Sequence, residues 1–222
     1  MIADNLARVR EKMASAAERS GRAAEGITLV AVTKMVGAER IREAIAAGIT
    51  DVGENYVQEA QDKWLELPRF SGRWHFIGHL QRNKVKAAVE FFNMIQSVDS
   101  LALAMEIGRR ALAAKRRVDV LIEVNAAGEV QKFGAPPDQA LDLAGEVAGV
   151  EGIRLCGFMG MTPFVEDPEL TRPYLARLRI LFERLPPEHR EHLSMGMTQD
   201  FEVAIEEGAT MVRIGTAIFG PR

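Results

Sequence analysis

Eight short apolar runs alternate with helix-like segments along this chain, and that alternation limits the folds open to it. The runs span residues 27–33, 50–54, 74–78, 93–98, 118–125, 153–159, 192–197 and 210–215. Most are continuously apolar, as strands of a parallel sheet buried on both faces are. Helical patterns lie between them at residues 38–48, 100–115, 137–150 and 199–208, and Gly48 and Gly208 stand where helix C-caps are expected.

Eight strands separated by helices predict a (β/α)8 TIM-type barrel. A doubly wound open sheet is the alternative, because both folds use βαβ units and strand periodicity does not separate them. The length of 222 residues suits a single domain over 1–222. The spacing of Leu, Val and Met at the start predicts an amphipathic N-terminal helix over 1–22, with no signal peptide.

Composition restricts the partners that we expect. A net charge of -3 gives the whole chain no electrostatic attraction to nucleic acid or to an acidic membrane, and no apolar run reaches membrane-spanning length. The single cysteine, Cys156, excludes an intramolecular disulfide and suits a reducing compartment; its strand-like surroundings indicate a buried thiol. We therefore expect a soluble, cytoplasmic protein.

In a barrel the functional site lies where the strands end, often with a phosphate held after strands 7 and 8. Lys34 ends the first strand, where desolvation lowers the pKa of an amine as a Schiff-base lysine requires. Ser194 ends the seventh strand, and Gly215 and Thr216 end the eighth, offering hydroxyls and a close backbone approach to an anion. These groups become neighbours when the barrel closes, which suggests a phosphorylated aldehyde, pyridoxal 5'-phosphate (PLP).

Arg213, near the end of the eighth strand, allows two interpretations. A buried arginine needs a partner for its charge, and an ion pair with a strand-end acid such as Glu123 is one option. If Arg213 instead faces the pyridine nitrogen of PLP, it can only donate, and the ring becomes a poor electron sink. For His75 and His79, a pocket or core role is favoured over a metal site, because no acids stand nearby in the sequence.

At these residues the chain resembles the pyridoxal phosphate homeostasis protein family, which is similar to the N-terminal barrel domain of alanine racemase. The matching stretches are LVAVTK, VGENYVQE, WHFIGHLQRNKVK, VNAAGEVQKFG, LSMGMTQDFEVAIEEG and VRIGTAIFG. They extend from about residue 27 to 220, essentially the whole chain. Two segments differ from the sequences usual in the family: TKMVGAE, after the first strand, and GFMGMTP, after the sixth.

The resemblance implies specific roles for individual residues. PLP would be bound covalently through Lys34, with Arg213 facing the pyridine nitrogen. Asn55 would line the pocket near the ring, and Lys132 aligns loosely with a ring-contacting position. The phosphate would be held by Ser194, Gly215 and Thr216.

The resemblance also implies a role in PLP homeostasis, in which the protein holds the cofactor and passes it to PLP-dependent apo-enzymes. An amino-acid racemase is the alternative, and racemisation needs acid/base groups on both faces of the substrate. The racemases supply the second group as a Tyr from a C-terminal domain, for which the sequence after Thr216 leaves no room; the chain has only Tyr56 and Tyr174. A Schiff-base aldolase is a third option. We expect a non-catalytic, monomeric PLP carrier.

Overall fold

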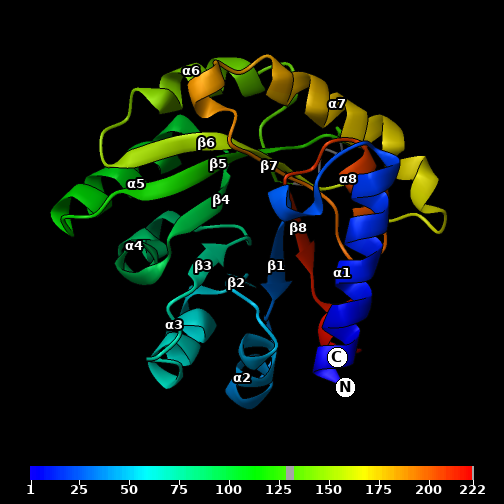
Figure 1. Cartoon of the computed structure of the whole chain (residues 1–222). Coiled ribbons are helices and arrows are strands. Elements are labelled where there is room, and N and C mark those ends of the chain that lie inside the picture. Colours follow the sequence, from blue (N-terminus) through cyan, green and yellow to red (C-terminus); the bar gives the residue numbers. More distant parts are fainter. Residues whose placement is uncertain (129–132, 222) are drawn as a thin grey trace.

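The computed structural model describes residues 1–128 and 133–221. Its centre is a closed barrel of parallel strands, in the order β1 to β8, ringed by helices (Figure 1). The strands are β1 (Thr28–Val32), β2 (Asp51–Glu54), β3 (Arg73–Phe76), β4 (Met94–Val98), β5 (Val118–Val124), β6 (Ile153–Gly160), β7 (His192–Ser194) and β8 (Met211–Ile214). Strand β1 pairs with β2 on one side and with β8 on the other, so the sheet closes on itself. The predicted barrel is confirmed, and the doubly wound open sheet is excluded.

Helices cover the outside of the barrel. They are α1 (Ile2–Arg19), α2 (Ala38–Ala46), α3 (Val57–Glu66), α4 (Val85–Phe91), α5 (Leu101–Ala113), α6 (Ala140–Ala148), α7 (Arg172–Glu183), α8 (Phe201–Glu206) and α9 (Thr216–Phe219). The observed α2, α5, α6 and α8 each lie inside the range predicted for them. Gly48 and Gly208 follow α2 and α8 with φ of 90° and 99°, the left-handed conformation that favours glycine at a helix end.

The predicted N-terminal helix, α1, packs across the outside of the barrel against α8 and α9. Its buried side chains recur every three or four residues, which gives one apolar stripe: Ile2, Leu6, Val9, Met13, Ala16 and Ala17. Two polar contacts fix its ends. Asn5 donates to the carbonyl of Ile218 at 2.9 Å, and Arg22, just after the helix, donates to the carbonyls of Ile205 and Ala209. The helix thereby ties the start of the chain to its last two helices, α8 and α9.

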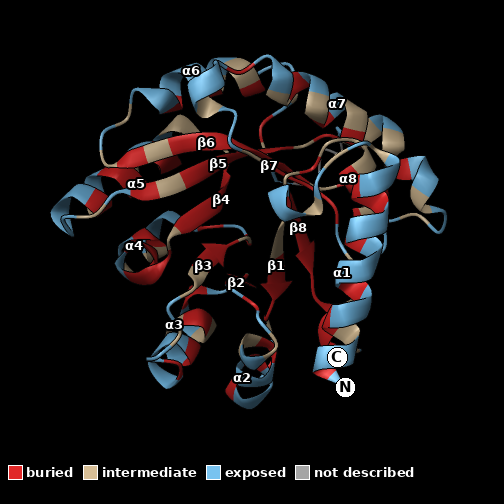
Figure 2. Ribbon diagram, in the orientation of Figure 1, coloured by how far each residue is buried: buried red, intermediate tan, exposed pale blue. Residues whose placement is uncertain are grey.

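The strands are buried along most of their length, whereas the helices turn an exposed face outward (Figure 2). Inside the barrel a compact apolar cluster fills the space between strands, formed by Val30, Met94, Leu121, Cys156, Met159 and Met211. Cys156 is the free, buried thiol that the sequence predicted. Burial, with the nearby charge of Asp119, raises its thiol pKa to about 12. In the described part of the chain, no helix is both long and apolar enough to cross a membrane.

Candidate functional site at the carboxyl ends of the strands

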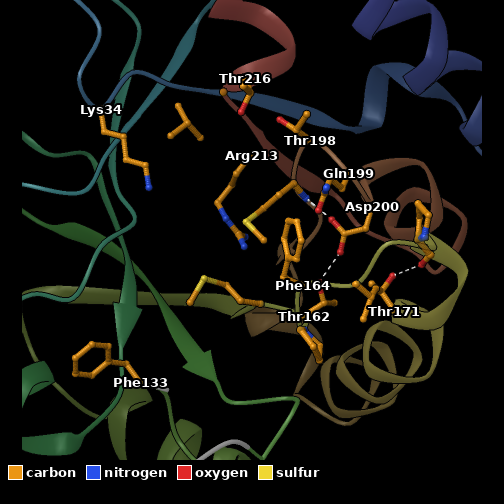
Figure 3. Close-up of a pocket in the computed structure, with 17 residues that line it drawn as sticks. Lys34, Phe133, Thr162, Phe164, Thr171, Thr198, Gln199, Asp200, Arg213 and Thr216 are labelled. Atoms are coloured by element: carbon orange, nitrogen blue, oxygen red, sulfur yellow. Dashed lines mark hydrogen bonds between the residues drawn. The ribbon is translucent and has the colours of Figure 1, made fainter. Parts of the chain in front are cut away.

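A cavity of about 700 Å³ opens where the barrel strands finish. This is the end of a barrel at which active sites are found, and the size suits a small ligand. Figure 3 shows side chains from several strand-end loops turned into it, Lys34 and Arg213 among them. The described residues that line it are Val32, Lys34, Phe133, Met161, Thr162, Pro163, Phe164, Val165, Pro168, Thr171, Met197, Thr198, Gln199, Asp200, Arg213, Gly215 and Thr216.

Lys34 follows β1 and reaches the cavity as the sequence predicted. The backbone around it is held by a small polar network. The next residue, Met35, has φ of 59°, unusual for a residue with a side chain, and its N–H donates to Oε1 of Glu59. Lys63 donates to the same Oε1 at 2.6 Å and to the carbonyl of Thr33 at 2.6 Å. These contacts hold the backbone of Thr33 and Met35, on both sides of Lys34. They therefore fix the direction in which the Lys34 side chain leaves the backbone.

The network continues inward to Glu54, a fully buried carboxyl group at the end of β2. Its Oε1 accepts from Thr33 Oγ1 at 2.7 Å and from Lys63 Nζ at 2.8 Å. Burial raises the pKa of Glu54, against the opposing effect of these two hydrogen bonds. The side chain of Lys63 is itself only 9% exposed, so this is a buried ion pair beside the loop that carries Lys34.

Arg213 lies at the floor of the cavity and is 4% exposed. Its Nη1 donates to Ser194 Oγ at 2.6 Å, and its Nη2 donates to the carbonyl of Gly160 at 2.8 Å. Among the described residues no carboxylate oxygen comes within 4.0 Å of it, so the ion pair with Glu123 is not formed. Burial lowers the pKa of Arg213 to about 10, partly offset by Asp200 and Glu123, so the side chain remains a cation near pH 7.

Glu123 is instead a buried acid on β5, at 4% exposure. Burial and the nearby charge of Asp99 raise its pKa to about 7, and the Arg213 cation opposes that rise. Near neutral pH a large fraction of these side chains is therefore protonated.

The groups predicted to hold a phosphate divide into two sets. Gly215 and Thr216 line the cavity, directly after β8. Ser194 is fully buried and is not among the lining residues, and its hydroxyl is engaged with Gln96 and Arg213. The hydroxyl from the β7 side that does line the cavity belongs to Thr198, which the sequence analysis did not select. A phosphate role for Ser194 stays a prediction, and Thr198 is the better placed donor.

Asn55 and Lys132 are the other two residues predicted from the family pattern. Asn55 follows β2 and is partly buried, but it is not among the described lining residues; its Oδ1 is buried and makes no hydrogen bond within the described part of the chain. Its role near a ring stays a prediction. Lys132 lies outside the described residues.

Asp200 is a buried lining residue that sequence reasoning missed. Its Oδ2 accepts from Thr162 Oγ1 at 2.6 Å, and its Oδ1 accepts from the backbone N–H of Met197 at 2.7 Å. It therefore joins the loops after β6 and β7. Its place before α8 gives no signal of this role, because an Asp there is typical of a helix cap, and Asp200 makes no side-chain cap bond to α8.

His75 takes the core role that the sequence favoured, whereas His79 is exposed and is not among the described residues that line the cavity. His75 is fully buried and bonded to Asp51 and Gln96. His79 stacks on Phe133, with ring centroids 3.8 Å apart. Within residues 1–128 and 133–221, no group of three or more His, Cys, Asp or Glu side chains is arranged to hold a metal ion.

Comparison with known proteins fits this geometry. Residues 4–222 match the family described as "Alanine racemase, N-terminal domain". The "Pyridoxal phosphate homeostasis protein" of Aquifex aeolicus is 44% identical over 222 residues, covering 99% of this chain and 97% of that protein. Its namesake in Escherichia coli K12 is 42% identical over 228 residues, covering 100% and 97%. The chain belongs to the pyridoxal phosphate homeostasis protein family.

Solved structures place this family member within the alanine racemase fold. One is the structure of PipY from Synechococcus elongatus with PLP bound. Its sequence is 34% identical to this one, its TM-score is 0.85, and the match covers 99% of this chain and 100% of that chain. Alanine racemase of Clostridium difficile is 15% identical with a TM-score of 0.74, covering 96% of this chain and 59% of that one. At that identity the second likeness shows a shared fold alone.

Proposed function

We propose that this protein binds PLP through a Schiff base on Lys34 and passes the cofactor to PLP-dependent apo-enzymes in the cytoplasm, without catalysing a reaction itself. The observation that carries the proposal is the shared cavity of Lys34 and Arg213 at the carboxyl end of the barrel. Membership of the homeostasis family and the PLP bound in PipY support the choice of ligand.

The side chains present fit PLP. Bound PLP supplies an aldehyde that condenses reversibly with an amine and releases water, and Lys34 is the one amine among the described lining residues. Arg213 is a pure donor that suits an unprotonated pyridine nitrogen. Gly215 and the hydroxyls of Thr216 and Thr198 follow β8 and β7, which are neighbouring strands, and suit a phosphate.

The same cavity supports a carrier over a racemase. Racemisation needs an acid/base group on each face of the substrate carbon. Among the described lining residues none is Tyr, His or Cys, and the carboxyl group of Asp200 is engaged by Thr162 and by the backbone of Met197. Of the two tyrosines, Tyr56 is 60% exposed and Tyr174 belongs to α7; neither lines the cavity. A pyridine nitrogen facing Arg213 also withdraws electrons poorly.

Absorbance of the protein mixed with PLP tests the binding. Wild type is expected to gain the visible band of a Schiff base, and borohydride reduction should attach the pyridoxyl group to the Lys34 peptide. Lys34→Ala should lose the band, whereas Lys86→Ala, which removes an exposed lysine on α4, should keep it. An unchanged spectrum in Lys34→Ala would refute Lys34 as the anchor.

The carrier role needs a separate test. The PLP-loaded protein should activate an apo-enzyme even when a scavenger removes free PLP. It should also fail to exchange the α-proton of L- or D-alanine into deuterated water. Rapid exchange would favour the racemase. Sedimentation analysis would test the monomer that we propose for the carrier.

A further inference from the structure

A line of buried polar side chains crosses the barrel interior beneath the cavity. Arg213 Nη1 lies 2.6 Å from Ser194 Oγ, and that Oγ lies 2.6 Å from Gln96 Oε1. Gln96 Nε2 lies 3.1 Å from His75 Nδ1, and His75 Nε2 lies 2.8 Å from Asp51 Oδ1. The three central residues are fully buried. The five residues come from β8, β7, β4, β3 and β2, and Asp51 lines a second cavity near the start of the strands.

Every hydrogen bond in this line donates in one direction, from Arg213 toward Asp51. The guanidinium can only donate, so Ser194 Oγ accepts from it and donates its own proton to Gln96 Oε1. The Gln96 amide is further fixed because Nε2 also lies 3.0 Å from the sulfur of Met211. Nδ1 of His75 must then accept, which leaves its proton on Nε2, pointed at Asp51.

The charges at the two ends are consistent with this direction. Arg213 is a buried cation without a carboxylate within 4.0 Å among the described residues, so its nearest compensation is the carbonyl of Gly160 and the Ser194 hydroxyl, whose dipole Gln96 orients. At the other end, burial raises the pKa of Asp51, but hydrogen bonds from His75 and Thr50 outweigh it, and the net effect lowers the pKa. Burial lowers the pKa of His75, which favours the neutral ring.

We propose that Gln96 and His75 are positioning residues for Arg213: with Ser194 they form a one-directional relay to Asp51 that fixes the guanidinium at the cavity floor. The effect of this relay on ligand release rests on the proposed binding of PLP. The relay itself does not, because its geometry exists in the protein alone.

The first experiment uses the protein without PLP. Nitrogen NMR of histidine-labelled protein resolves four histidines, and loss of one signal in His75→Gln assigns His75. A neutral ring protonated at Nε2, with Nδ1 shifted as an acceptor, is expected at pH 7. Gln96→Leu should shift the Nδ1 signal, whereas Leu121→Met should not, since Leu121 belongs to the apolar cluster of the same interior but stands on β5, which contributes no residue to the relay. A ring protonated at Nδ1, or one in tautomer exchange, overturns the relay.

The second experiment measures release of PLP from the loaded protein. Gln96→Leu should release PLP about fivefold faster and shift the visible band, because Ser194 loses the acceptor that orients its hydroxyl relative to Arg213, and loss of a neutral hydrogen bond typically has an effect of about that size. Leu121→Met should stay within about twofold of wild type. Gln96→Glu retains an acceptor for Ser194 and should restore slow release; its second oxygen then faces Nδ1, so His75 should take up a proton that NMR reports.

The outcomes separate the two proposals. If wild type forms no Schiff base, the PLP proposal fails and the tautomer of His75 still decides the relay. If Gln96→Leu is folded and keeps both the wild-type release rate and visible band, the positioning role is wrong. If Gln96→Leu does not fold, Ser194→Ala is measured instead, because it removes the hydroxyl that accepts from Arg213. The proposal then requires the same increase in the rate of PLP release from Ser194→Ala.

Discussion

The buried carboxyl group of Glu123 makes a quantitative prediction about stability and pH. Its pKa of about 7 in the folded protein compares with 4.5 for an unperturbed Glu. Between these values the folded chain keeps a proton that the unfolded chain releases. The free energy of unfolding therefore falls as pH rises through this window, because the folded state binds more protons. From pH 5 to pH 8 the two pKa values correspond to a loss of about 2–3 kcal/mol.

Glu123→Gln removes this dependence while nearly preserving the shape of the side chain. Urea unfolding at pH 5 and pH 8 should show wild type losing about 2–3 kcal/mol more than the variant across that range. The variant should therefore gain stability relative to wild type as pH rises. Comparing the two proteins cancels the other groups that titrate in the same window.

The control is Glu43→Gln, the same chemical change at an exposed position on α2. Its stability should follow wild type at both pH values. If the stability of Glu123→Gln also changes between pH 5 and pH 8 as that of wild type does, then Glu123 is ionised in the folded protein over that whole range. The argument from burial would then be wrong.

Three further predictions concern residues around the barrel. Lys63→Met should destabilise the protein by about 3 kcal/mol at pH 7, since it leaves Glu54 as a buried carboxylate without its cation. The loss should shrink as the pH is lowered, because burial raises the pKa of Glu54 and favours its neutral form; urea unfolding at pH 7 and at lower pH measures this. Met35→Val should destabilise by about 1–2 kcal/mol because a β-branched residue fits φ of 59° poorly, whereas Met35→Gly should change stability by less than about 1 kcal/mol. A thiol reagent should modify Cys156 only after unfolding, given its burial and its pKa of about 12; rapid native labelling would contradict this.

The fold was predictable because each strand of a parallel barrel is buried on both faces and so appears as a continuous apolar run. Closure itself was not encoded in any one run. It depends on the pairing of β1 with β8, a contact between the two ends of the chain. Only the count of eight strands favoured the barrel, and the open sheet stayed possible until that pairing was seen.

Lys34, Arg213, Gly215 and Thr216 could be located because carboxyl ends of parallel strands meet on one rim. Side-chain direction past a strand end is harder to predict. β7 ends at Ser194, as predicted, although the apolar run continues to residue 197, and Gly196 then turns the chain with φ of 91°. That turn leaves Ser194 inside the barrel and brings Thr198 to the cavity.

The buried polar side chains beneath the cavity show why the sequence, taken one residue at a time, does not reveal the whole site. Gln96 stands beside Ser97 in a strand whose burial is complete, and the polar type of these two residues marks them as exceptions among apolar ones. The partners of Gln96, His75 and Ser194, are 21 and 98 residues away along the chain, and no periodic pattern links them. A buried polar group needs a partner, and here one partner lies on the adjacent strand β3 and the other on β7, across the barrel interior, so the contacts form only on folding. An unexplained polar residue in a buried strand is therefore the sequence signal for an interior network, and the structure identifies its members.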